Sequence, residues 1–250
     1  MKQLFSIVII LLLLGCEKAG ENAAFAGGGT GQGGSMARFT IMGNYLYTVD
    51  KENLKVFDIT NVAQPVFKRN VPVGFEIETI FPFKDKLFIG STSVVHIFSI
   101  ADPANPQKLS EAISPQVMRR CDPVVAKDNV AYATLRTNGP CGGTQSILAS
   151  YDITDITKPV QKGSSPVWEP YGLGYSGNTL YVCDGIEGLV VFDISNAYTP
   201  LRVNLIQPPS GSKFMDLIPY NDLLVCWVTD GMILYDITDK QNPVLIKKII

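Results

Sequence analysis

Short apolar stretches separated by turn residues fill most of the chain after residue 36. Residues 171–206 show this pattern most clearly, with apolar stretches at 171–175, 180–183, 189–194 and 201–206. Ser-Gly-Asn at 176–178 and Asp-Gly at 184–185 lie between them, and both sequences tolerate the positive φ of tight hairpins. The pattern predicts four antiparallel strands joined by short turns.

One phrase recurs five times along the chain: an aromatic residue, then Asp or Ser, then Ile, with a Pro seven residues after the Asp column. The Asp column holds Asp58, Ser99, Asp152, Asp193 and Asp236, at intervals of 41 to 53 residues. Four-stranded units repeating at this length are typical of propeller blades. We therefore expect residues 36–250 to form one all-β domain, a single β-propeller of five four-stranded blades.

The polar residues of the phrase have a structural explanation. A carboxylate or hydroxyl in the Asp column can accept hydrogen bonds from turn amides, and the Asn or Asp three residues later can begin an Asx-type turn. One such group per blade cannot converge on a single site. The phrase therefore predicts capped turns rather than a metal or acid/base centre.

The fourth repeat carries the resemblance to a known family. Leu-Tyr-Val-Cys-Asp-Gly at 180–185 and Gly-Leu-Val-Val-Phe-Asp-Ile-Ser at 188–195 resemble the LVIVD repeat of bacterial surface and exported proteins. The resemblance covers nearly all of residues 36–250 and implies a propeller in an exported protein. Ser99 and Ser150 depart from the pattern, so blades two and three are expected to be the less regular ones.

The sequence allows two ways of closing the propeller ring. Five complete blades fit between residue 36 and residue 250, which leaves no strand over to pair the two ends of the chain in one blade. Closure would then depend on blade five packing against blade one. A permuted register, in which the C-terminal strand completes the first blade, is the alternative.

The N-terminus has the features of an export signal. Lys2 precedes an apolar run of 11 residues, Leu4–Leu14, which is too short to span a bilayer. The ending Leu-Leu-Gly-Cys resembles the lipobox of bacterial lipoproteins, and this resemblance implies that residues 1–15 are removed and that Cys16 is lipidated. An ordinary secreted protein with a chance Cys at this position is the alternative.

The segment after Cys16 predicts a tether. Residues 16–35 are rich in Gly and Ala and cannot bury a core. Glu17, rather than Asp, follows the lipidated Cys and favours the outer membrane of a Gram-negative bacterium. We therefore expect a lipid-anchored protein of the cell envelope, with the membrane as one partner.

Composition and charge narrow the possible functions. The chain is 46% hydrophobic and 18% charged, with 21 Lys plus Arg against 23 Asp plus Glu and one His. The net charge of -2 provides no basic excess for nucleic acid. The chain contains no H-E-x-x-H, C-x-x-C or P-loop motif, so we expect neither a metal nor a cofactor. His96 shares a strand column with Lys55 and Val190 and is expected to be an edge or interface residue.

The four cysteines beyond Cys16 fall into two pairs. Cys121 precedes the first strand of blade three and Cys141 lies in that blade's long insertion, and both loops should open on the same face, which predicts a disulfide. Cys183 and Cys226 each lie ten residues before the Asp column. They are expected to be equivalent buried thiols on neighbouring blades, on the order of 10 Å apart.

A binding site, if the propeller has one, is expected at the channel mouth on the face of the loops that enter each first strand. The residues of these loops mix charge with aromatic side chains: Arg38, Phe75, Glu76, Arg119, Arg120, Trp168, Glu169, Lys213 and Phe214. Such a rim could bind a polar ligand or a protein. The plainer interpretation is a solvated rim.

Two functions are compatible with these features. The first is a non-catalytic propeller on an envelope membrane that binds or scaffolds a protein or glycan partner. The second is a channel-site hydrolase of an envelope or extracellular substrate, in which paired carboxylates would act. Because no catalytic set can be recognised, the sequence favours the first, although a fold alone does not determine function.

Overall fold

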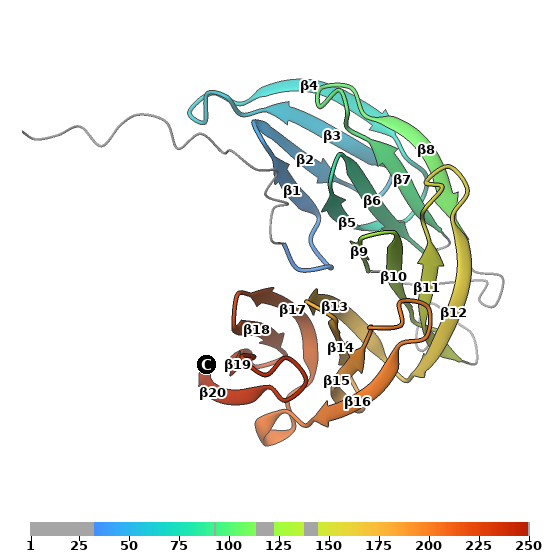
Figure 1. Cartoon of the computed structure of the whole chain (residues 1–250). Coiled ribbons are helices and arrows are strands. Elements are labelled where there is room, and N and C mark those ends of the chain that lie inside the picture. The colour runs from blue at the N-terminus through green and yellow to red at the C-terminus, as the bar shows by residue number, and fades with distance from the viewer. Residues whose placement is uncertain (1–32, 93, 114–122, 138–144, 250) are drawn as a thin grey trace, which may run out of the picture.

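The computed structural model describes residues 33–92, 94–113, 123–137 and 145–249. In these ranges it contains twenty strands, arranged as five antiparallel sheets of four strands that pair in chain order. The sheets follow one another around a central axis, with the first strand of each innermost and the fourth outermost (Figure 1). The expected all-β propeller of five blades is confirmed.

The strands of the blades have the following bounds. Blade one contains β1 (Phe39–Met42), β2 (Tyr45–Val49), β3 (Asn53–Asp58) and β4 (Val66–Pro72). Blade two contains β5 (Ile77–Phe83), β6 (Lys86–Ser91), β7 (Val95–Ser99) and β8 (Gln107–Ala112). Blade three contains β9 (Val124–Lys127), β10 (Val130–Leu135), β11 (Ser146–Asp152) and β12 (Val160–Val167). Blade four contains β13 (Pro170–Ser176), β14 (Thr179–Asp184), β15 (Gly188–Asp193) and β16 (Leu201–Ile206). Blade five contains β17 (Phe214–Tyr220), β18 (Leu223–Val228), β19 (Gly231–Asp236) and β20 (Val244–Ile249).

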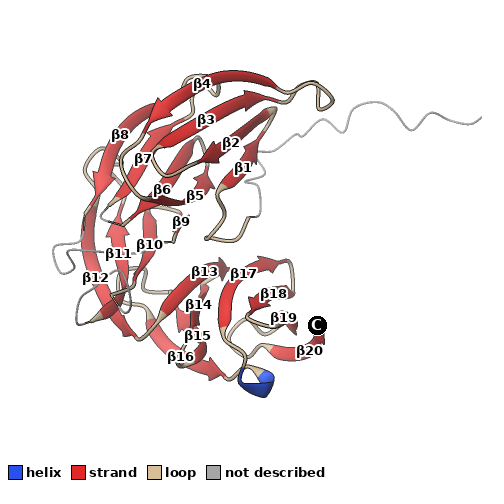
Figure 2. Cartoon of the chain, turned by 180° about the vertical axis from the view of Figure 1, so that it is seen from behind, coloured by secondary structure: helices blue, strands red, loops and turns tan. Residues whose placement is uncertain are grey.

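Helix is almost absent from the described chain. Its one helical segment is the 3-10 turn η2 (Pro209–Gly211), drawn in blue between blades four and five (Figure 2). A helix long and apolar enough to cross a membrane is not found among the described residues.

The repeated phrase forms the same local structure in every blade. The Asp-column side chain accepts a hydrogen bond from the amide two residues later, for example Asp58 Oδ1 from Thr60 N at 2.9 Å and Asp193 Oδ1 from Ser195 N at 2.7 Å. Ser99 Oγ replaces the carboxylate in blade two and accepts from Ala101 N at 3.2 Å. These bonds confirm the capped turns that the phrase predicts.

A register shift accompanies each cap. In all five blades the pairing of the third and fourth strands skips one residue just before the aromatic position, as between Val56 and Phe57 or between Val191 and Phe192. An extra residue in one strand bends it and increases its twist. The phrase therefore encodes both the turn and the curved outer edge of the blade.

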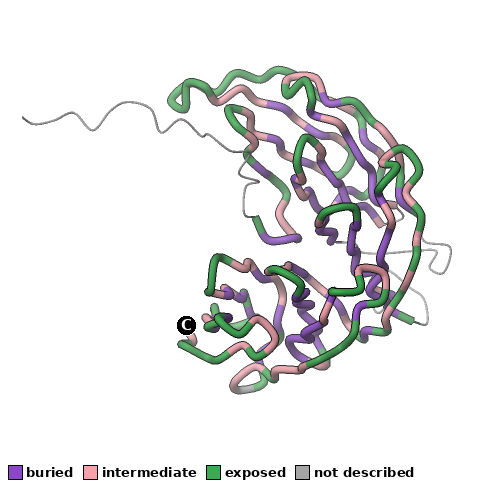
Figure 3. The backbone as a smooth tube through the Cα atoms, in the orientation of Figure 1, coloured by how far each residue is buried: buried purple, intermediate pink, exposed green. Residues whose placement is uncertain are grey.

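The core lies between the blades. Four clusters of buried apolar side chains join blade one to two, two to three, three to four and four to five. The second strands are the most deeply buried, since all six residues of β10 and of β14 are buried (Figure 3). The described residues form no such cluster between blade five and blade one.

The ring is therefore closed in neither of the two expected ways. The C-terminal strand β20 pairs with β19 in blade five, which excludes the permuted register, and blades one and five stand apart on either side of an opening (Figures 1 and 2). The expected packing of blade five on blade one is wrong. The five blades therefore do not complete a circle (Figure 1).

A short segment before β1 bridges the opening at the axis. Ser35 Oγ accepts a hydrogen bond from Leu173 N at 2.7 Å and donates to Asp216 Oδ1 at 3.4 Å. Met36 N donates to Asp216 Oδ2 at 3.3 Å, and Ala37 O accepts from Ile80 N at 2.9 Å. Backbone and hydroxyl contacts to blades two, four and five thus replace a sheet contact.

Cys183 and Cys226 are free, buried thiols, as expected. Their predicted equivalence is wrong, because Cys183 is four residues beyond Thr179, the partner of Asp193, whereas Cys226 is three beyond Leu223, the partner of Asp236. A shift of one residue turns a side chain to the other face of its sheet. The two thiols consequently face each other's blade within one apolar cluster. Cys121 and Cys141 lie outside the described residues, and their disulfide stays a prediction.

Candidate functional site

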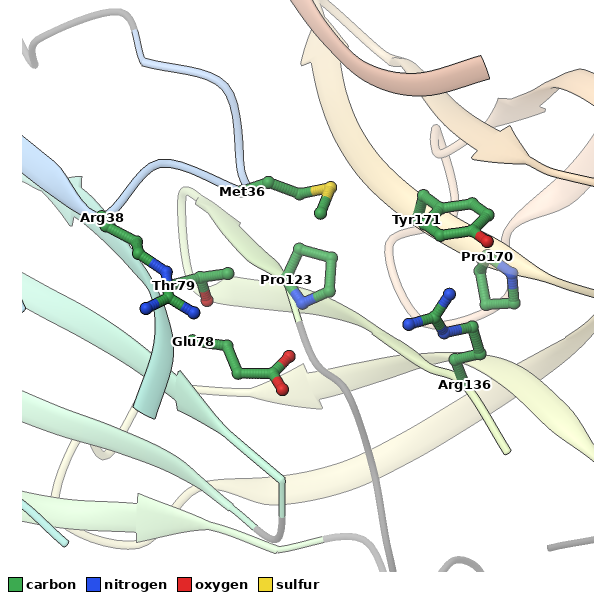
Figure 4. Close-up of a pocket in the computed structure, with 8 residues that line it drawn as sticks. All are labelled: Met36, Arg38, Glu78, Thr79, Pro123, Arg136, Pro170 and Tyr171. Carbon is green, nitrogen blue, oxygen red and sulfur yellow. The ribbon is translucent and has the colours of Figure 1, made fainter. Parts of the chain in front are cut away.

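A cavity lies at the mouth of the central channel, on the face of the loops that enter each first strand. Its volume is about 180 Å³, and the side chains that line it come from four of the five blades (Figure 4). The lining consists of Met36, Arg38, Glu78, Thr79, Pro123, Arg136, Pro170 and Tyr171.

Each polar lining residue stands at an end of an inner strand. Glu78 and Thr79 are at the start of β5, Tyr171 is at the start of β13, and Arg136 follows directly after β10. Arg38 precedes β1. Because all first strands of a propeller run in the same direction along the axis, these ends gather at one mouth of the channel.

The cavity contains two guanidinium groups and one carboxylate. The Arg136 guanidinium lies over the Tyr171 ring, 4.4 Å from its centroid. Burial raises the pKa of Glu78, and the positive charges of Arg136 and Arg38 offset this shift only in part. Figure 4 shows the Glu78 carboxylate pointing into the space between Arg38 and Arg136.

The expected rim residues separate into several environments. Arg38 lines the cavity, while Phe75 and Trp168 project into solvent with 78% and 61% of their surface exposed. Lys213 Nζ and Glu169 Oε2 form an ion pair at 3.0 Å across blades four and five. These residues lie on the expected face, and their role in binding stays a prediction.

The remaining expected rim residues are Glu76, Phe214, Arg119 and Arg120. Glu76 Oε2 accepts a hydrogen bond from Thr92 Oγ1 at 2.6 Å. Phe214 is fully buried in the core between blades four and five, so its assignment to an exposed rim is wrong. The strand alternation turns it inward at the first residue of β17. Arg119 and Arg120 lie outside the described residues.

A buried carboxylate holds the Trp168 loop in place. Asp184 is 1% exposed, and its Oδ2 accepts hydrogen bonds from Trp168 N at 2.8 Å and Glu169 N at 3.1 Å. Its Oδ1 accepts from Ile186 N at 3.0 Å and Glu187 N at 2.9 Å. Asp184 therefore fixes two adjacent loops of blade four and presents Trp168 outward.

Reasoning from the sequence missed Glu78, Arg136 and Tyr171. These three residues do not lie in the loops that enter the first strands. Glu78 and Tyr171 are the second residues of β5 and β13, and Arg136 is the first residue after β10. Their common position at the channel end of an inner strand is the signal that could have found them. The described lining holds a single carboxylate, whereas the paired-carboxylate hydrolase considered from the sequence would use two.

Other chemistry is sparse in the described chain. No group of three or more His, Cys, Asp or Glu residues that could hold a metal ion occurs within the described ranges. His96 is buried at the interface of blades one and two, as its strand column predicts, with its Nδ1 3.1 Å from Glu111 Oε1. Burial and the nearby Lys108 lower the pKa of His96.

Comparison with known proteins supports the repeat and the fold. The LVIVD repeat family matches residues 33–73 and 173–202, which correspond to blade one and most of blade four. No curated protein matches the chain.

Solved structures resemble the chain at low sequence identity. A protein from Lactobacillus plantarum has a TM-score of 0.59 at 16% identity, over 82% of this chain and 67% of its own. A periplasmic gluconolactonase from Pseudomonas aeruginosa has a TM-score of 0.58 at 13% identity, over 83% and 67%. BamB from Moraxella catarrhalis has a TM-score of 0.56 at 11% identity, over 84% and 59%. The chain thus spans about 60 to 67% of the length of these neighbours, and the likeness shows the fold alone.

Proposed function

From a propeller built of LVIVD repeats, we propose a lipid-anchored module of the bacterial cell envelope that binds a protein or glycan partner at its channel mouth. The observation that carries this proposal is the cavity, lined from four blades and flanked on the same face by the exposed Phe75 and Trp168. Exposed aromatic side chains beside a concave polar site are common in recognition surfaces.

The proposal has three supports besides the cavity. Glycan and protein surfaces both offer polar groups to arginine and flat faces to aromatic rings. The rim is not an extension of the core, because Trp168 is 61% exposed although its loop is fixed by Asp184. The Leu-Leu-Gly-Cys sequence and the Gly-rich segment after it favour an anchor and a tether, and Glu17 favours the outer membrane.

Anchoring is tested by Cys16→Ser. We expect the variant to lose palmitate labelling and to leave the membrane fraction, because a diacylated cysteine supplies the two-chain attachment that holds a protein on a bilayer. Cys226→Ser, which alters a buried thiol, is the matched control and should stay labelled. Equal labelling of the wild type and Cys16→Ser would contradict the anchor.

Partner binding is tested by crosslinking in the cell envelope. A photoreactive group at the exposed Glu76 should yield a discrete crosslinked species in the wild type and much less of it in the Phe75→Ala/Trp168→Ala variant. Val62→Ala is the control, because Val62 is 81% exposed in the turn between the third and fourth strands, at the other end of the blade. A crosslinking pattern unchanged by the double substitution would contradict binding at this face.

A further inference from the structure

We propose that the channel-mouth cavity is a carboxylate-binding site, in which Arg38 and Arg136 hold the acidic group of the partner. This inference rests on the proposed function and specifies the chemistry of the ligand. It follows from the hydrogen-bonding state of Arg136, the charge of the lining and the size of the cavity.

Arg136 has donor capacity that the described protein does not use. Its Nε is buried and has no hydrogen-bond partner among the described residues. The guanidinium is stacked on Tyr171, so the ring covers its face but not the edge at which its N–H groups lie. A buried donor without an acceptor costs about 1 to 3 kcal/mol. A ligand with a paired-oxygen group would satisfy it.

The part of the lining that the structure describes has a net positive charge at neutral pH. Arg38 and Arg136 face Glu78 alone, and no ion pair within 4.0 Å joins Glu78 to either arginine in the described chain. Glu76, the other acidic group whose charge acts on Glu78, is hydrogen bonded to Thr92 outside the cavity. The two cations therefore remain available to an anion.

Size and shape select the class of anion. A cavity of about 180 Å³ is smaller than the roughly 300 to 1,000 Å³ of sites for whole drug-sized ligands, so it fits one functional group. Arginine binds carboxylates through two parallel N–H···O bonds. Met36, Pro123, Pro170 and Tyr171 provide apolar walls for the carbon atoms next to such a group. A carboxylate on a short carbon stem suits this lining better than a free, fully hydrated phosphate.

A carboxylate of this kind occurs on uronic acids and on acidic side chains, and calorimetry distinguishes them. The full chain is titrated with glucuronate, with N-acetylglutamate methylamide, with inorganic phosphate and with uncharged glucose. We expect at least one carboxylate to bind with millimolar or better affinity and glucose not to bind. Binding of phosphate alone, or of neither carboxylate, would overturn the proposal.

Substitutions locate the binding in the cavity. Arg136→Gln and, independently, the exposed Arg38→Gln should each weaken carboxylate binding tenfold or more. Arg69→Gln removes the same charge from the exposed outer strand β4 of blade one, away from the channel mouth, and should leave the affinity unchanged. Because Arg136 is half-buried, thermal melts accompany each variant, and Arg38→Gln tests the site even if Arg136→Gln unfolds. Equal affinities for all three variants would refute the site.

Substitution of Glu78 should have the opposite effect on carboxylate binding from substitution of the arginines. Its raised pKa means that the carboxyl group gains a proton at a higher pH than an ordinary glutamate does, which removes a negative charge from the cavity. Carboxylate binding should therefore tighten as Glu78 becomes protonated, and Glu78→Gln should bind several-fold more tightly and lose this pH dependence. If Arg136→Gln abolishes carboxylate binding but the envelope crosslink persists, this inference survives only for a free ligand and the partner is held by the rim. If carboxylates bind while Phe75→Ala/Trp168→Ala leaves the crosslinks unchanged, the site stands and the proposed function fails.

Discussion

Asp216 accepts hydrogen bonds that stabilise the fold, but its burial disfavours the charged carboxylate. Its carboxylate accepts hydrogen bonds from Leu217 N at 2.9 Å and from the Ser35–Met36 segment that bridges the opening of the ring. Burial nevertheless dominates and raises the pKa of Asp216 to about 6, because desolvation disfavours the charged form. Gly172 makes the close approach possible, since a Cβ there would collide with this carboxylate.

The raised pKa predicts a pH dependence of stability. A folded-state pKa of about 6 against 3.8 in the unfolded chain means that the folded state binds more protons between these values. The contribution of Asp216 to the free energy of unfolding is therefore complete below pH 4 and falls by up to about 3 kcal/mol as the pH rises through 6.

Asp216→Asn should remove this dependence, because the amide keeps an acceptor oxygen but cannot ionise. Urea unfolding of the wild type and the variant from pH 4 to pH 7 measures the difference, which also cancels the titration of His96 and of the other carboxylates. If the difference in free energy of unfolding between the two proteins stays constant from pH 4 to pH 7, ionisation of Asp216 does not destabilise the fold and the prediction is wrong.

At the scale of the element, register decides where a side chain points. The strands of blade five match those of blade four in length and pairing, but the turn between β18 and β19 is one residue shorter than the turn between β14 and β15. Cys226 consequently takes the column of Val182, and Trp227 takes the column of Cys183. Counting residues back from the Asp column could not detect this, because the count runs through the turn.

The hairpins between first and second strands share one turn conformation although the residues in the turn differ. The first turn residue has positive φ in every blade, at Gly43, Lys84, Asp128, Gly177 and Asn221. Only two of the five are glycine. The geometry of the hairpin therefore imposes positive φ on Lys84 and Asp128, although residues other than glycine disfavour it. Packing of the blade must offset this cost in free energy.

At the scale of the whole molecule, the open ring leaves one face of blade five without a neighbour. Leu189 of blade four pairs with Cys183 and is fully buried against blade five, whereas its equivalent Met232 pairs with Trp227. Met232 and Trp227 are 41% and 51% exposed. The repeat thus keeps apolar side chains in these columns even where no further blade of the described chain covers them.

This matched pair tests whether the opening persists in solution. Leu189→Ala should lower the free energy of unfolding by about 2 to 5 kcal/mol, since it empties part of a packed core. Met232→Ala should cost less than about 1 kcal/mol, because Met232 is already 41% exposed to water. Denaturant unfolding of the two variants side by side measures both values. Comparable losses would mean that the blade-five face is covered.

The sequence by itself determined the architecture of this protein. The five copies of the phrase carry their own turn chemistry, since Asp58, Asp152, Asp193 and Asp236 bond amides only two residues away, and local interactions of this kind depend on no distant part of the chain. The number of blades, the strand order and the burial of Cys183 and Cys226 followed from such repeated local patterns.

Only the tertiary structure decided how the blades are arranged and what they bring together. Large side chains pack across the interfaces, such as Tyr181 and Phe214 between blades four and five, and the five blades packed in this way leave the ring open (Figure 1). The cavity gathers Arg38, Glu78 and Arg136 from three blades, separated by 40 to 98 residues in sequence. No local pattern marks such residues, because what they share is a position around an axis that exists only after the blades have packed.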